Sequence, residues 1–152
     1  MRVIGVGNRW RSDDAAGLHV ARRLLEDGPA GADVLEREGE PAGLIEAFAG
    51  TEALVVVDAV SSGSPPGTIH RVEAGEAALP AEVFGASTHL LGLAEAIELA
   101  RALGRLPKRV VVYGIEGRVF EAGEQLSPEV EDAVERVAIA VREEVERCTN
   151  GR

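Results

Sequence analysis

Residues 53–58 read ALVVVD, an uninterrupted apolar run rich in β-branched residues that ends on an acid. Continuous rather than alternating hydrophobicity is typical of a strand buried on both faces, as in the parallel sheets of α/β proteins. We therefore expect Ala53–Val57 to form a central strand, with Asp58 directly after its end.

Three further apolar runs predict strands that accompany this one, and helical patterns alternate with them. The strands are expected at Arg2–Gly7, Ala32–Arg37 and Arg109–Ile115, with an extra extended segment at Thr68–Val72. The helices are expected at Ala15–Glu26, at Leu44–Ala49, from a Ser87 or Thr88 cap to Leu103, and after Ser127-Pro128. This alternation predicts a three-layer α/β fold, with a mostly parallel sheet flanked by helices on both faces. We expect a single domain over residues 1–148 and a frayed C-terminus at residues 149–152.

Composition restricts the possible partners. The 152 residues carry a net charge of −10, which would repel nucleic acid and anionic membranes. The single cysteine, Cys148, cannot form an internal disulfide. The chain starts directly with a strand pattern, and it has no apolar run near the roughly 18 residues that a membrane span needs. We therefore expect a cytoplasmic protein with no nucleic-acid or membrane partner.

Three loops place polar residues beyond the carboxyl ends of the predicted strands, where open α/β sheets bind ligands. They are residues 5–14 (GVGNRWRSDD), Asp58, and residues 87–89 (STH). Two carboxylates and an imidazole, from Asp14, Asp58 and His89, could ligate a divalent transition metal such as nickel or zinc. Three protein ligands would leave coordination positions open for water or substrate, as in catalytic sites.

Each feature also has a purely structural interpretation. The glycine turn at residues 5–7 could be only a tight turn, because Trp10 replaces the third glycine of a G-x-G-x-x-G fingerprint. Asp13 and Asp14 could both cap a helix, and His89 on its own could be structural. The two other histidines have no acidic loop companion and are interpreted as structural: His19 and His70.

Four motifs in the same order resemble those of the hydrogenase maturation proteases, the endopeptidases that complete the large subunit of [NiFe] hydrogenases. The motifs are Gly5-Val6-Gly7-Asn8 with Asp13-Asp14 and Gly17, Val57-Asp58, Ser87-Thr88-His89, and Tyr113-Gly114-Ile115-Glu116 with a later Leu126-Ser127. The resemblance spans nearly the whole chain. It implies a twisted five-stranded sheet between helices, and removal of a C-terminal extension from the large-subunit precursor after nickel insertion.

The resemblance also implies roles for individual residues. In the family an acid of the first loop, an aspartate at the third strand and a histidine ligate the metal, which by motif gives Asp14, Asp58 and His89. It further implies substrate contacts at Gly7 and Asn8.

The chain departs from the family pattern at two places. Relatives often have glutamate in the first loop, whereas this chain has the shorter Asp14, so Asp13 remains a rival for that role. The loop after the second strand, often Gly-Thr-rich in relatives, reads Gly39-Glu40-Pro41 here, so substrate contacts are not carried over to it.

The implied site would act as a checkpoint, because cleavage would depend on nickel that the substrate carries. The metal would polarise the scissile carbonyl or lower the pKa of a bound water. Alternatively it would only position the peptide, with Asp14 or Asp58 as general base. The isolated protein is then expected to be metal-free or to hold an adventitious divalent ion.

Two other functions remain open at this point. Residues 85–89 (GASTH) approach the G-x-S-x-G motif of a serine hydrolase with Ser87 as nucleophile, but residues 79–84 do not form the strong strand that a nucleophile elbow needs. A non-enzymatic module could bind a small anionic ligand at the glycine turn. The acids Asp13, Asp14 and Asp58 oppose this function, because they would repel a phosphate.

Overall fold

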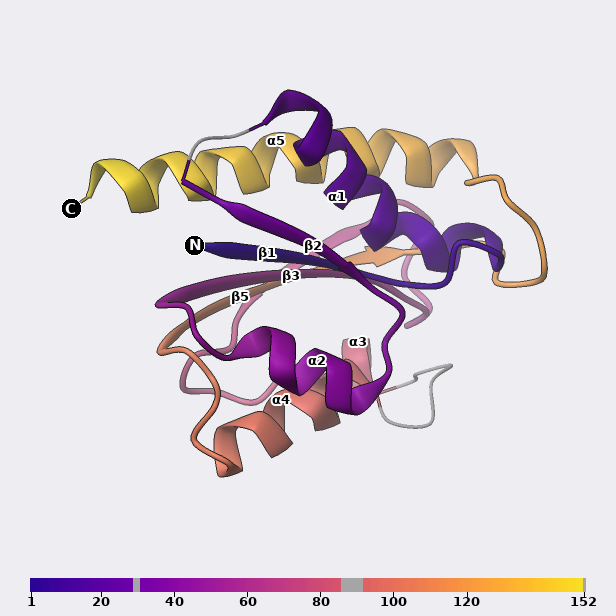
Figure 1. Cartoon of the computed structure of the whole chain (residues 1–152). Coiled ribbons are helices and arrows are strands. Elements are labelled where there is room, and N and C mark those ends of the chain that lie inside the picture. Colours follow the sequence, from indigo (N-terminus) through magenta and orange to yellow (C-terminus); the bar gives the residue numbers. More distant parts are fainter. Residues whose placement is uncertain (29–30, 86–91, 152) are drawn as a thin grey trace.

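The computed structural model describes residues 1–28, 31–85 and 92–151, and shows a sheet of five strands between two layers of helices (Figure 1). The strands are β1 (Arg2–Val6), β2 (Asp33–Arg37), β3 (Ala53–Val60), β4 (Ile69–Glu73) and β5 (Arg109–Glu116). The helices are α1 (Ala16–Asp27), α2 (Pro41–Phe48), α3 (Ala81–Phe84), α4 (Leu93–Ala102) and α5 (Pro128–Asn150), and a 3-10 helix, η1 (Ser12–Ala15), precedes α1.

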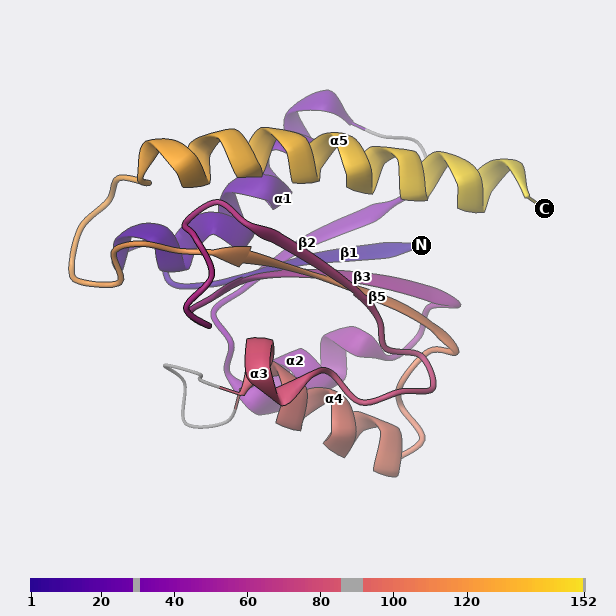
Figure 2. The ribbon, with the colours of Figure 1, turned by 180° about the vertical axis from the view of Figure 1, so that it is seen from behind.

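The sheet has the order β2-β1-β3-β5-β4, and only β4 runs antiparallel to its neighbour. Helices α1 and α5 cover one face, while α2, α3 and α4 lie on the other (Figures 1 and 2). Each face of β3 contributes to its own core, Val55 and Val57 to one and Leu54 and Val56 to the other. The predicted three-layer, mostly parallel α/β fold is therefore confirmed. No helix in the described ranges is both long and apolar enough to cross a membrane.

Strand β3 extends further than the apolar run alone predicts. It continues through Ala59 to Val60, so Asp58 lies within the strand instead of after its end. Asp58 pairs with Gly114 of β5, and this ladder keeps the backbone hydrogen-bonded beyond the acid. The predicted end of the strand at Val57 is thus three residues too early, although Asp58 still lies near the carboxyl end.

The helix starts also differ from the prediction. Helix α2 begins at Pro41 instead of Leu44, because the Glu40 carboxylate accepts hydrogen bonds from the amides of Ala42 and Gly43, both at 2.9 Å. Helix α4 begins at Leu93 with an extended Gly92 as its N-cap. The predicted cap at Ser87 or Thr88 is therefore wrong, and both residues lie outside the described part of the chain. The single-turn α3 was not predicted.

Helix α5 begins at the predicted Ser127-Pro128 boundary, but the Ser127 side chain does not cap it. The helix continues through Thr149 and Asn150, which the sequence places in a frayed C-terminus. Its apolar stripe packs on the sheet, with one buried acid among the valines. Glu144 accepts hydrogen bonds from Arg71 of β4 at 2.7 Å and from the Tyr113 hydroxyl of β5 at 3.0 Å, which compensates its buried charge.

Candidate active site

The carboxyl ends of β1, β3 and β5 meet at one edge of the sheet, and η1 packs against this edge. Two glycines make the close approach possible. A Cβ atom at Gly7 would lie 2.1 Å from the Asp14 carbonyl oxygen, and one at Gly17 would lie 2.3 Å from the Val57 carbonyl oxygen. Any larger residue at either position would therefore push η1 and α1 away from the strands.

Asp14 lies in η1 and is buried. Its carboxylate accepts a hydrogen bond from the Asn8 amide at 3.1 Å, which ties it to the loop after β1. The residues at the N-cap positions of η1 and α1 are Arg11 and Ala15, and neither makes a side-chain cap. The capping interpretation of Asp14 is therefore wrong, and its carboxylate lies at the sheet edge.

Asp58 is 7% exposed, and its carboxylate accepts one hydrogen bond, from the Ala59 amide at 2.8 Å. Burial raises the pKa of Asp58 well above its usual value, the negative charge of Asp14 raises it further, and the bond from Ala59 lowers it in part. Asp14 and Asp58 are thus close enough to repel each other. Among the described residues, no arginine, lysine or histidine forms an ion pair with either acid.

Asp13, the rival acid, has a different environment. Its buried carboxylate accepts hydrogen bonds from the amides of Arg118 at 2.8 Å and Val119 at 2.9 Å. It also accepts from the amide and the hydroxyl of Ser127, both at 2.7 Å. Burial alone would raise the pKa of Asp13, but these bonds outweigh it and lower the pKa. Asp13 therefore anchors the loop after β5, and it does not cap a helix.

The loops after β1 and β5 are joined along their backbones as well. The Ser12 amide donates to the Gly123 carbonyl, the Asp13 amide to the Val119 carbonyl, and the Gly123 amide to the Trp10 carbonyl, each at 2.9 Å. The Ser12 hydroxyl adds a bond to the Glu121 carbonyl at 2.8 Å. The two loops thus form one ordered platform beside Asp14, a pairing that no local sequence pattern indicates.

The third predicted ligand, His89, lies outside the described residues, together with the rival nucleophile Ser87. Within residues 1–28, 31–85 and 92–151 no group of three His, Cys, Asp or Glu side chains is arranged to hold a metal ion. The structure therefore brings Asp14 and Asp58 together, and the three-ligand set stays a prediction.

A second polar cluster at this edge was missed by sequence reasoning. Glu116, the buried last residue of β5, accepts a hydrogen bond from the Ser62 amide at 3.1 Å and another from the Ser62 hydroxyl. The His70 ring nitrogen lies 3.3 Å from the same carboxylate. The interpretation that His70 has no acidic companion is therefore wrong. The strand exit that ends in Glu116 was the available signal, but His70 reaches it only through the antiparallel pairing of β4 with β5.

This geometry does not support the two rival functions, a serine hydrolase and a module that binds a small anionic ligand. A one-turn helix, α3, precedes residues 85–89 in place of the strand that a nucleophile elbow requires. The glycine turn faces the buried acid Asp14, which would repel an anionic ligand.

Comparisons with known proteins agree on one family. The family model described as hydrogenase maturation protease matches residues 19–144. The chain is 31% identical over 150 residues to the hydrogenase 2 maturation protease of Escherichia coli, covering 93% of this chain and 90% of that protein. It is 30% identical over 135 residues to the hydrogenase expression/formation protein HupD of Thiocapsa roseopersicina, and the match covers 87% of this chain but only 61% of HupD. The structure of the [NiFe] hydrogenase maturation protease HybD from Thermococcus kodakarensis superposes with a TM-score of 0.74 at 25% identity, covering 95% of this chain and 97% of HybD.

Proposed function

This chain belongs to the hydrogenase maturation protease family of endopeptidases, and we propose that it removes the C-terminal extension of a [NiFe] hydrogenase large-subunit precursor after nickel insertion. The substrate is inferred from the names of the relatives, which describe them as maturation proteases of hydrogenases. In this proposal nickel arrives as part of the substrate, so it is not a resident cofactor.

One observation carries the nickel part of the proposal. Asp14 and Asp58 are buried next to each other, Asp14 raises the pKa of Asp58, and no cationic side chain among the described residues pairs with them. Two buried carboxylates in this arrangement repel each other unless a proton or a cation intervenes. A divalent ion presented by the substrate would remove the repulsion, so the pair would bind the loaded precursor better than the unloaded one.

We assign the third ligand to His89, because an imidazole with two carboxylates suits nickel and leaves coordination positions for the substrate. The metal would supply electrostatic stabilisation at the scissile carbonyl. A carboxylate oxygen of Asp14 or Asp58 that is not bound to the metal would accept a proton from the attacking water and return it to the leaving amine. In that step the water oxygen bonds to the carbonyl carbon and the peptide C–N bond breaks.

Gly7 and Asn8 would contact the substrate backbone beside Asp14. The Asn8 amide is already bonded to Asp14, so a peptide that approaches this loop would reach the acid directly. Glu40 is engaged in capping α2, which leaves its loop without a free carboxylate at that position.

Maturation of a nickel-loaded precursor, followed on a gel as a shift to the shorter form, tests the proposal. We expect Asp58→Asn and His89→Ala to abolish processing while circular dichroism shows an intact fold. Ser87→Ala and the exposed Asp132→Asn should process normally. Asp13→Asn is not a suitable control, because its carboxylate anchors the loop after β5.

Three outcomes would count against the proposal. Retained cleavage in Asp58→Asn would exclude the acid pair as the catalytic and metal-binding group. Complete loss in Ser87→Ala with the fold preserved would favour the serine mechanism. Equal cleavage of a nickel-free precursor would remove the nickel checkpoint and leave an ordinary endopeptidase.

A further inference from the structure

The loop after β1 exposes a tryptophan that the fold does not bury. Trp10 is 54% exposed, and the Arg9 guanidinium lies 5.0 Å from the centre of its ring. Leaving an indole in water forgoes roughly 25 cal/mol for each Å² of apolar surface that burial would remove from solvent. Single exposed apolar residues are common on proteins, so exposure alone does not define a binding surface. Two further observations single out Trp10.

First, the Trp10 backbone is fixed in place and connected to the candidate catalytic acid. Its amide donates to the Asn8 side-chain oxygen at 2.9 Å, and the Asn8 amide donates to Asp14 at 3.1 Å. On the other side its carbonyl accepts from the Gly123 amide at 2.9 Å. Trp10 therefore stands two hydrogen bonds from Asp14 on an ordered backbone, which lowers the conformational entropy lost when a partner binds.

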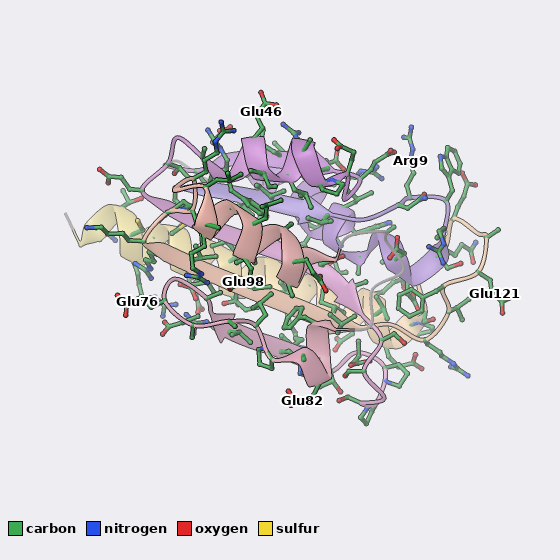
Figure 3. The ribbon with its side chains drawn as sticks, turned by 90° about the horizontal axis from the view of Figure 1, so that it is seen from below. Arg9, Glu46, Glu76, Glu82, Glu98 and Glu121 are labelled. Atoms are coloured by element: carbon green, nitrogen blue, oxygen red, sulfur yellow. The ribbon has the colours of Figure 1, made fainter. Side chains whose placement is uncertain are left out.

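Second, a cleft with a volume of about 440 Å³ opens beside Arg9, between α1 and the end of β2. We call it the Arg9 cleft, and its lining residues are Arg9, Leu18, Arg22, Glu36, Arg37 and Glu38. The Gly7 amide donates to the Arg37 carbonyl at 3.0 Å, so the cleft directly adjoins the candidate active site. Figure 3 shows Arg9 projecting outward from this end of the molecule.

Only one of the three arginines in the Arg9 cleft forms an ion pair with a carboxylate of the described residues. Arg22 donates to the Glu36 carboxylate at 2.9 Å, and Arg37 donates to the Glu36 carbonyl at 2.7 Å. Within the part of the chain that the structure describes, Arg9 and Arg37 form no ion pair with a carboxylate. Three arginines and two glutamates line the cleft, so its lining has a small positive excess in a chain whose net charge is −10. Guanidinium groups bind carboxylates with matched geometry.

We propose that Trp10 and the Arg9 cleft are the docking surface for a segment of the large-subunit precursor that presents an apolar side chain next to a carboxylate. The indole takes the apolar side chain, and Arg9 and Arg37 take the carboxylate. Tryptophan and arginine are the residues that most often dominate binding energy at interfaces. This inference rests on the proposed function and names the surface that selects the substrate, apart from the acids that cleave it.

Steady-state cleavage of the nickel-loaded precursor by Trp10→Ala and Arg9→Glu tests the docking surface. We expect KM to rise about tenfold or more in each variant, with kcat within about twofold of wild type, because a docking contact acts on binding and not on the chemical step. The KM of wild type should rise with salt, and that of Arg9→Glu should respond less.

The matched controls are Ile139→Ala, a residue of α5 that is 53% exposed, and Arg105→Glu, an exposed residue in the connection between α4 and β5. Both should leave KM and kcat unchanged. Unchanged KM in Trp10→Ala and Arg9→Glu, or a loss confined to kcat, would overturn the docking surface. A change of oligomeric state in Trp10→Ala on gel filtration would overturn it too, by assigning the tryptophan to a second copy of this chain. Absence of cleavage by the wild-type protein would instead overturn the proposed function.

Discussion

Asp13 and Asp58 are both buried aspartates, and their surroundings shift their pKa values in opposite directions. Burial raises the pKa of both side chains. At Asp13 the donors of Arg118, Val119 and Ser127 outweigh the burial and stabilise the charged form. At Asp58 only the Ala59 amide opposes the burial, and the charge of Asp14 adds to it. The first acid is therefore suited to hold structure, and the second to exchange a proton or meet a cation.

The raised pKa of Asp58 predicts how stability depends on pH. Its folded-state pKa lies above the ordinary value of 3.8, so the stability that the protonated form contributes is complete below pH 3.8 and is lost as the pH rises from there through the folded value. Asparagine resembles the protonated form in shape and charge. We expect Asp58→Asn to melt at or above the wild-type temperature near neutral pH, with the difference vanishing below about pH 3.8.

Thermal melts of both proteins at several pH values, without added metal, check this expectation. A variant that melts well below wild type at neutral pH would contradict it, since that result would mean that the Asp58 charge is compensated in the folded protein.

At the scale of elements, the contact between α1 and the sheet depends on backbone packed against backbone. A Cβ atom at Gly17 would lie 2.3 Å from the Val57 carbonyl oxygen and 2.4 Å from that of Val6. Neither oxygen can move without breaking the sheet. This close packing brings η1, and with it Asp14, to the end of β3.

We therefore predict that Gly17→Ala destabilises the protein by about 1–3 kcal/mol or more, and weakens processing by displacing Asp14. Gly43→Ala is the matched control, because Gly43 is also near the start of a helix. Its added Cβ would meet only the flexible end of Glu40, at 3.0 Å. That variant should stay within about 1 kcal/mol of wild type. Denaturant unfolding measures both, and equal stability of the two variants would exclude the steric explanation.

At the scale of the whole molecule, most of the buried carboxylates among the described residues lie at one edge of the sheet, and Glu144 of α5 is the exception. Three buried aspartates lie there, at the end where the loops after β1 and β5 pair. The described part of the site has two carboxylates and no cationic partner, so we expect it to bind a free divalent ion only weakly. Weak binding would suit the proposed function, in which the substrate carries the metal.

We accordingly predict that the isolated protein, dialysed against a chelator, holds no stoichiometric metal by elemental analysis. Added Ni²⁺ should bind weakly in calorimetry and more weakly still in Asp58→Asn. Because a net charge of −10 attracts cations in general, Asp132→Asn serves as the control for non-specific binding. Stoichiometric zinc that survives the chelator would point to an ordinary zinc peptidase instead.

Most of the architecture could be predicted from local patterns. The continuous apolar run at Ala53–Val57 indicated a two-sided strand, and Ser127-Pro128 marked the start of α5, because burial and capping preferences act over a few residues. One boundary failed because it depends on a partner distant in sequence, since pairing with β5 carries β3 through Asp58 to Val60. The N-cap of α4 is Gly92 in place of the predicted Ser87 or Thr88.

The sequence by itself indicated which residues could be chemically active, because Asp14 and Asp58 lie near the carboxyl ends of strands, where ligands bind in this class of fold. Only the tertiary structure separated Asp14 from its neighbour Asp13. Asp13 is saturated by donors that are 105 to 114 residues away, at Arg118, Val119 and Ser127. The structure likewise paired His70 with Glu116, 46 residues apart. The role of a carboxylate follows from the donors and charges around it, and the folded chain alone brings these groups together.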